Sequence, residues 1–201
     1  MQNNHQMKKA YIILAPGFEL LEATAPIDVL ERCGVQVEKV AAHQSLLVPS
    51  SHSVFLKADT LLQEQEDVDR ILSDADMVIL PGGYPGYENL SRNSLVGAIL
   101  AGMESSGRKI AAICGAPSAL AVFGIAGNSK ITCHSSVKEL MASRENGQPA
   151  YFYTGNEVEK DGNLTTGRGA GVSLQFAFAC ASELVSEDII AEVKRKMEIS
   201  S

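Results

Sequence analysis

The sequence predicts an α/β fold with a doubly wound, mainly parallel sheet and helices on both faces. Two observations support this prediction. Short apolar runs that suit fully buried strands alternate along the chain with longer segments whose apolar residues recur at helical spacing. The chain has 201 residues, which is enough for one domain with helices on both sides of a sheet. We therefore expect residues 9–201 to form a single domain after a polar N-terminal extension over residues 1–8.

The N-terminal part of the chain predicts an opening strand, helix and strand. Ala10–Ala15 is an apolar strand, and apolar residues at helical spacing follow it until Gly34, a typical helix stop. Pro26 is expected to kink this helix or to start a second piece after Thr24. The next predicted elements are a strand at Val35–Ala42, a short hairpin of Leu46–Val48 and Val54–Leu56, an acidic helix over residues 63–76, and a buried strand at Met77–Leu80.

The remaining segments continue the alternation. Leu95–Ser106 has a helical pattern, and the apolar run Ile110–Ile113 follows it as a buried strand. A helix with Pro117 in its first turn and Gly124 beyond its end comes next. The last predicted elements are a strand end at Ile131–His134, a helix through Met141, strands at Tyr151–Tyr153, Val158–Lys160 and Leu164–Thr166 with a hairpin turn at Asp161-Gly162, and helices over residues 172–185 and 187–197.

Charge and composition narrow the classes of partner. The formal net charge of −7 and a pI near 5.1 argue against nucleic acid or an anionic membrane. The apolar run near the N-terminus is too short for a signal peptide or a membrane span, so the expected compartment is the cytoplasm. The cysteines form no C-x-x-C pair and the histidines have no ligand spacing, so we expect reduced thiols and no metal site.

The stretch from Lys109 to Ser118 predicts a cysteine on a sharp turn between a strand and a helix. Such a turn places Cys114 at the carboxyl end of the sheet, where open α/β folds bind ligands. The thiol then faces the positive start of the next helix, which favours the thiolate. Gly115 leaves the tightest part of the turn without a side chain. The alternative is a buried structural cysteine.

Two other strand ends deliver functional groups to the same edge of a parallel sheet. Glu19 and Glu22 follow the first strand, and Gly82-Gly83 follows the strand that ends at Leu80. Two buried like charges repel each other, so a Glu22 side chain beside a thiolate is expected to be protonated and to donate a hydrogen bond to the sulfur. The alternative is a pair of solvated glutamates in the first turn of a helix, where the helix dipole stabilises them.

The glycine turn and a histidine complete the set of candidate groups. The backbone amides of the Gly82-Gly83 turn and of Gly115 could hold a developing oxyanion, although a plain tight turn is the simpler reading. His134 could approach Cys114 as a base or orienting residue, although a lone histidine is more often structural. We assign the other cysteines, Cys33, Cys133 and Cys180, to packing. The glycine-rich TTGRGAG matches neither nucleotide-binding pattern.

The ordered motifs LAPGFELLEA, VILPGG, AAICGAP, ITCH and TTGRGAG resemble the ThiJ/PfpI family, and within it the deglycase-like DJ-one branch that contains the parkinsonism-associated protein. The resemblance runs from about Lys9 to Leu184. It implies a flavodoxin-like fold and a homodimer with the first helix at the interface. The same resemblance implies the following site: Cys114 as the reactive cysteine, Glu22 as its partner carboxylate, His134 as the histidine near the cysteine, and the amides of Gly83 and Gly115 at the oxyanion position.

The chain departs from the family pattern in two places, the elbow and His52, and it differs from the protease members at Gly115. The elbow reads Cys-Gly-Ala-Pro where relatives commonly have Cys-Ala-Gly-Pro, which keeps a small residue after Cys114. His52 lies where several relatives carry an arginine at the site margin, which puts an anion-binding role there in doubt. The protease members place a histidine directly after the cysteine, and this chain has Gly115 there, which argues against proteolysis.

The resemblance implies a cysteine enzyme without a cofactor that acts on 2-oxoaldehydes such as methylglyoxal, or on their protein adducts, as a glyoxalase III or deglycase. Its partners would be a small aldehyde or a glycated protein. An alternative is an oxidative-stress sensor or chaperone that uses oxidation of the same cysteine to the sulfinate. A third reading, a protein of thiazole monophosphate biosynthesis, has less support because the sequence has no phosphate-binding loop.

Overall fold

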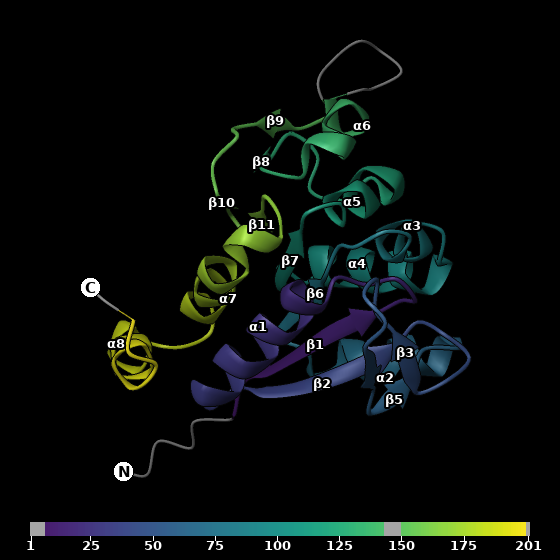
Figure 1. Cartoon of the computed structure of the whole chain (residues 1–201). Coiled ribbons are helices and arrows are strands. Elements are labelled where there is room, and N and C mark those ends of the chain that lie inside the picture. The colour runs from purple at the N-terminus through teal and green to yellow at the C-terminus, as the bar shows by residue number, and fades with distance from the viewer. Residues whose placement is uncertain (1–6, 143–149, 200–201) are drawn as a thin grey trace.

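The computed structural model describes residues 7–142 and 150–199. Its centre is a seven-stranded sheet with helices on both faces (Figure 1). The strands of this sheet, in spatial order, are β10 (Val158–Asp161), β11 (Leu164–Gly167), β7 (Lys109–Ile113), β6 (Met77–Leu80), β1 (Lys9–Leu14), β2 (Gln36–Ala41) and β5 (Thr60–Leu61). The polar extension predicted for residues 1–8 falls largely outside the described residues, and the domain boundary at residue 9 stays a prediction.

The sheet is parallel except at one edge. Its neighbouring strands pair in parallel from β11 to β5, and β10 pairs with β11 in an antiparallel hairpin through the predicted Asp161-Gly162 turn. The strands β1, β2, β6, β7 and β11 have the spatial order 2-1-3-4-5 when numbered along the chain, which is the flavodoxin-like order. The predicted α/β, doubly wound, flavodoxin-like class is confirmed.

The helices divide between the two faces of the sheet. One face is covered by α1 (Leu20–Arg32), α7 (Ser173–Ser182) and α8 (Glu187–Lys196), which lie together at the left of Figure 1. The other face is covered by α2 (Gln65–Asp74), α3 (Gly86–Ser91), α4 (Ser94–Ser105), α5 (Pro117–Phe123) and α6 (Lys138–Ala142). The last of these follows a 3-10 turn at Ser135–Val137, and another, Ala170–Val172, leads into α7.

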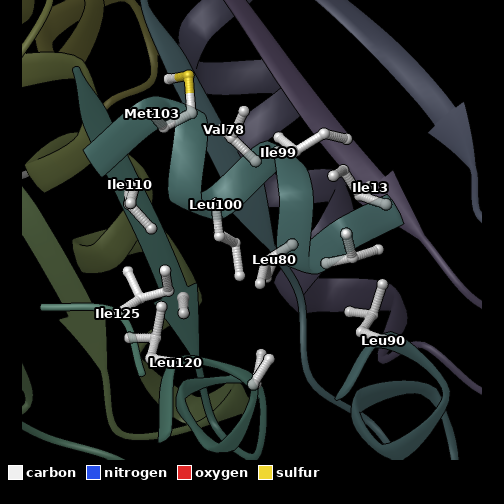
Figure 2. Packing of buried hydrophobic residues seen from close by; sticks show 14 of the residues in the cluster. Ile13, Val78, Leu80, Leu90, Ile99, Leu100, Met103, Ile110, Leu120 and Ile125 are labelled. Carbon is white, nitrogen blue, oxygen red and sulfur yellow. The ribbon is translucent and has the colours of Figure 1, made fainter. Parts of the chain in front are cut away.

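Successive side chains of each strand serve the two faces in turn. In β1, Ile13 packs into the core under α4, while Ile12 and Leu14 pack into the core under α1 and α7. Figure 2 shows the first of these cores, where Leu80 and Ile110 from the sheet meet Leu100 from α4. This two-sided burial explains why the strands read as continuous apolar runs.

Two small sheets lie outside the central one. The predicted hairpin is present as β3 (Leu47–Pro49) and β4 (Phe55–Lys57), one residue later than expected. The strand expected over Ile131–His134 is only β8 (Lys130–Ile131), which pairs with β9 (Phe152–Tyr153) rather than with the central sheet. The helices within the described ranges include none that is long and apolar enough to cross a membrane.

The expected break at Pro26 is wrong in one respect. Helix α1 runs without interruption from Leu20 to Arg32, and Pro26 lies buried inside it rather than starting a second piece after Thr24. A proline within a helix removes one backbone donor. The hydroxyl of Thr24 donates to the carbonyl of Leu20 at 2.7 Å within the same turn, and the buried face of α1 packs on the sheet and α7. Tertiary packing therefore holds the helix together.

Candidate active site around Cys114

The candidate site lies at the carboxyl end of the sheet, beside the point where the strand order reverses. The chain goes from β1 outward to β2 on one side and later returns to β6 on the other, so the ends of β1 and β6 flank a crevice. Glu22 comes from the helix after β1, Gly82 and Gly83 follow β6, and Cys114 follows the neighbouring strand β7. The topology thus brings the predicted groups to one edge.

Cys114 lies on a strained turn. Its φ of +64° is in the left-handed region, which a residue with a side chain adopts at a cost of about 1–3 kcal/mol. Two backbone hydrogen bonds hold it there: its amide donates to the carbonyl of Gly167 at 2.9 Å, and its carbonyl accepts from the amide of His134 at 2.8 Å. Cys114 is half-buried, whereas the other three cysteines are buried. The predicted strand, sharp turn and helix are therefore present.

Glu22 is fully buried next to Cys114. Its Oε2 accepts a hydrogen bond from the amide of Gly82 at 2.8 Å, while its Oε1 is buried without a hydrogen-bond partner among the described residues. Burial raises the pKa of Glu22 from 4.5 to about 7, although contacts with Cys114 and Gly82 oppose the rise. The alternative prediction, that Glu22 is a solvated residue in the first turn of a helix, is therefore wrong. A buried carboxyl with an orphaned oxygen suits the protonated form.

The turn before a helix predicts that Cys114 favours the thiolate, but the surroundings of Cys114 favour the neutral thiol. Burial and the adjacent Glu22 carboxylate raise the pKa of Cys114 to about 12. The amides of Gly83 and Gly115 donate toward the sulfur and lower this pKa in part, but burial and the negative neighbour prevail. A proton on Glu22 removes the charge repulsion and leaves the amides facing the sulfur. The protonation of Glu22 therefore controls how readily Cys114 ionises.

The glycines of the turn after β6 are required by close packing. A Cβ on Gly82 would lie 2.7 Å from the Cβ of Cys114 and 2.7 Å from Oε2 of Glu22. Gly83 has a φ of +90°, and a Cβ there would lie 2.3 Å from the amide nitrogen of Glu19. The backbone of this turn therefore lies directly against the thiol and the carboxyl, with its amides available as donors.

His134 is joined to Cys114 through its backbone, while its ring is occupied elsewhere. Its Nδ1 lies 2.8 Å from the Ser136 hydroxyl and accepts from the Ser136 amide at 3.2 Å, so the exposed imidazole caps the 3-10 turn that follows. The ring faces a cavity of about 480 Å³ that Arg168 and Tyr153 also line. The described contacts include none between this ring and the Cys114 sulfur. A role for the imidazole stays a prediction.

A polar cluster lies at the margin of the site. The hydroxyl of Ser51 lies 3.0 Å from Oε2 of Glu19 and 3.0 Å from Nδ1 of His52, and that nitrogen lies 3.2 Å from the same carboxylate oxygen. Ser51 and His52 are exposed, whereas Glu19 is half-buried and adds to the rise in the pKa of Glu22, whose main cause is burial. The imidazole of His52, at the position predicted to lie at the site margin, is therefore already in contact with an acidic side chain.

Sequence reasoning missed Tyr87, whose ring lies against Gly115. A Cβ on Gly115 would lie 2.4 Å from Cδ1 of Tyr87, so the ring occupies the space that a larger residue after Cys114 would fill. The only sequence signal for this contact is the small residue Gly115 after Cys114 together with a tyrosine that follows the Gly82-Gly83 turn, on the short helix α3. Within the described ranges, the side chains form no group of three or more that could hold a metal ion.

The chain is similar to known proteins over most of its length. A sequence model of the DJ-1/PfpI family matches residues 8–183. The Parkinson disease protein 7 homolog of Danio rerio is 36% identical over 93% of this chain and 95% of its own. A protein of Caenorhabditis elegans named glutathione-independent glyoxalase DJR-1.2 is 31% identical over 88% of this chain and 89% of its own. The crystal structure of Drosophila melanogaster DJ-1beta superposes with a TM-score of 0.87 at 35% identity, over 98% of this chain and all of that one.

Proposed function

The chain belongs to the DJ-1/PfpI family, and from this premise we propose that it is a cofactor-independent cysteine enzyme of the glyoxalase III or deglycase kind. Its substrates are 2-oxoaldehydes such as methylglyoxal, or their protein adducts, and its products are 2-hydroxy acids. The observation that carries the proposal is the buried contact of Glu22 with Cys114 under the amides of Gly83 and Gly115. A relative named as a glutathione-independent glyoxalase supports the reaction class.

The reaction begins with attack of the Cys114 sulfur on the aldehyde carbon. The new C–S bond converts the carbonyl oxygen into an oxyanion, for which the amides of Gly83 and Gly115 are the nearest donors. Protonation of this oxygen gives a hemithioacetal. Transfer of the hydrogen from the former aldehyde carbon to the neighbouring carbonyl gives a 2-hydroxyacyl thioester, and water then releases the 2-hydroxy acid and the thiol. The sum is one aldehyde and one water converted into one acid.

Glu22 carries the protons in this scheme. With a pKa raised to about 7, it exists in both forms at neutral pH, which suits a group that donates a proton in one step and accepts one in another. Its unpartnered Oε1 is available for this transfer. We keep His134 as the second candidate for proton transfer, because its backbone contacts Cys114 and its ring lines the neighbouring cavity.

The test is formation of lactate from methylglyoxal by purified protein without glutathione. We expect Cys114→Ser to reduce turnover to the rate in buffer and Glu22→Gln to reduce it about 100-fold. The matched control is Cys33→Ser, the same chemical change at a buried cysteine at the end of α1. Lactate formation that survives in Cys114→Ser, or that is equally lost in folded Cys33→Ser, would defeat the proposal.

Oxidation of Cys114 is the second candidate function. Of the four cysteines, all within the described ranges, Cys114 alone is not buried, which gives peroxide access to it first. A sulfinate formed there would lie beside the Glu22 carboxyl, which could donate a hydrogen bond to it once protonated. This supports a role as an oxidative-stress sensor or chaperone that uses the same residues.

We also propose that the chain forms a homodimer through α1 in the cytoplasm. Leu21 on this helix is 57% exposed although the opposite face of the helix is buried in the core. The support for this interface is the family resemblance, which implies a homodimer with the first helix at the interface, and Leu21 is an apolar side chain of α1 that is available for such a contact. Burial of Leu21 against a second copy would place the paired sites close to the interface.

A further inference from the structure

Two tyrosines lie on the turn and short helix that follow the Gly82-Gly83 amides. The Tyr87 ring is packed against the backbone of Gly115, where an added Cβ would lie 2.4 Å from Cδ1 and 2.7 Å from Cγ of the ring. Tyr84 directly follows Gly83 and is 68% exposed. Tyr87 therefore packs directly against one of the two glycines proposed to supply an oxyanion donor, and Tyr84 follows the other in the chain.

The two rings form an aromatic pair. Their centroids are 6.2 Å apart and their planes meet at 55°, within the range of tilted aromatic contacts. Tyr87 is half-buried and Tyr84 projects into solvent. Tyr87 links the pair to the site, because its ring lies against Gly115, the residue directly after Cys114. The exposed ring of Tyr84 therefore has apolar surface that no core residue covers and that a bound ligand could contact.

The backbone that carries the pair is held firmly. The amide of Tyr87 donates to the carbonyl of Gly83 at 2.9 Å, and the side chain of Asn89 donates to the carbonyl of Pro16 at 2.9 Å. Gly86 packs so tightly that a Cβ there would lie 2.7 Å from the amide nitrogen of Phe18. The tyrosines therefore project from a fixed segment, which lets them discriminate between substrates rather than adapt to each.

We propose that Tyr84 and Tyr87 form an aromatic wall beside Cys114 that binds the substituent of the 2-oxoaldehyde and favours aryl substituents over the methyl group of methylglyoxal. This inference rests on the proposed function for its reaction. An aryl ring bound beside Cys114 would contact both tyrosine rings, whereas a methyl group reaches little of that surface. One such aromatic contact corresponds to about tenfold in affinity.

The experiment compares kcat/KM for phenylglyoxal, which would give mandelate, with kcat/KM for methylglyoxal. The wild type should favour phenylglyoxal. Tyr84→Ala should lower the ratio of the two values about tenfold, and Tyr84→Phe, which keeps the ring, should restore it. Phe152→Ala, which removes another exposed aromatic ring from β9, should leave the ratio as in the wild type. An unchanged ratio in Tyr84→Ala, or an equal fall in Phe152→Ala, would overturn the proposal.

A binding measurement separates this inference from the reaction. The chain has no tryptophan, so tyrosine fluorescence reports on its five tyrosines directly. In the Cys114→Ser background, which cannot turn over substrate, mandelate should bind about tenfold more tightly than lactate, and Tyr84→Ala should remove the difference. If the wild type converts neither aldehyde, the proposed function fails, and this titration alone decides on the aromatic wall. Equal affinities for mandelate and lactate would overturn it.

Discussion

Replacing Glu22 by glutamine removes a fully buried carboxyl and keeps an oxygen that can accept from the amide of Gly82. Burial raises the pKa of this carboxyl from 4.5 to about 7, which corresponds to about 3 kcal/mol in favour of its neutral form. Between pH 4.5 and about 7 the native protein holds a proton on Glu22 that the unfolded chain has released. The free energy of unfolding of the wild type must therefore fall as pH rises through this window.

Glu22→Gln has no proton to lose, so its free energy of unfolding lacks this fall. We expect the variant minus wild-type difference to increase by about 3 kcal/mol from pH 4.5 to 7 and to stay level just above 7. The measurement is urea unfolding at a series of pH values, followed by far-ultraviolet circular dichroism. The difference cancels groups that titrate alike in both proteins, and a general loss of stability in the variant changes its offset but not its slope.

Glu31→Gln is the matched control, since it removes an exposed carboxyl from the same helix with the same change of charge. Its difference from the wild type should stay flat over the window. A flat difference for Glu22→Gln, or one that falls as pH rises, would refute the account of a buried, readily protonated Glu22.

Three further predictions follow from the same geometry. Gly82→Ala would force a Cβ to within 2.7 Å of Cys114, so it should destabilise the fold by about 2 kcal/mol and slow alkylation of Cys114 by iodoacetamide; an unchanged Tm and an unchanged rate would contradict the close packing. Graded hydrogen peroxide should add two oxygens to Cys114 before it modifies Cys33, Cys133 or Cys180, as read by intact mass and peptide mapping, whereas equal oxidation of all four cysteines would argue against preferential access. Leu21→Glu should convert a dimer into a monomer in light scattering after size exclusion, and a monomeric wild type or a dimeric variant would remove α1 as the interface.

The sequence was sufficient for the parts of the site that depend on topology. The apolar run before Cys114 and the proline after it predict a strand, turn and helix, and these are present as β7 and α5. Since the carboxyl ends of parallel strands meet at one edge, the meeting of Glu22, Gly82 and Cys114 also followed.

The remaining features depend on packing, which spacing does not encode. The start of a helix predicts a lowered pKa for Cys114, but the burial and the Glu22 carboxylate that raise it arise only in the folded chain. Pro26 predicts a break in the first helix, but α1 is continuous, because it is held by tertiary contacts that the local sequence does not reveal. The short α3 was missed because six residues give too little periodicity, and with it the contact of Tyr87 with Gly115.

The most direct test of the central claim is detection of the covalent intermediate on Cys114. Wild-type protein in excess over methylglyoxal would be quenched with acid at successive times, digested and analysed by mass spectrometry. The proposed reaction predicts one methylglyoxal equivalent on the peptide that contains Cys114, disappearing at the rate at which lactate appears. Lactate formed without this adduct, or an adduct confined to lysine and arginine side chains, would contradict Cys114 as the nucleophile.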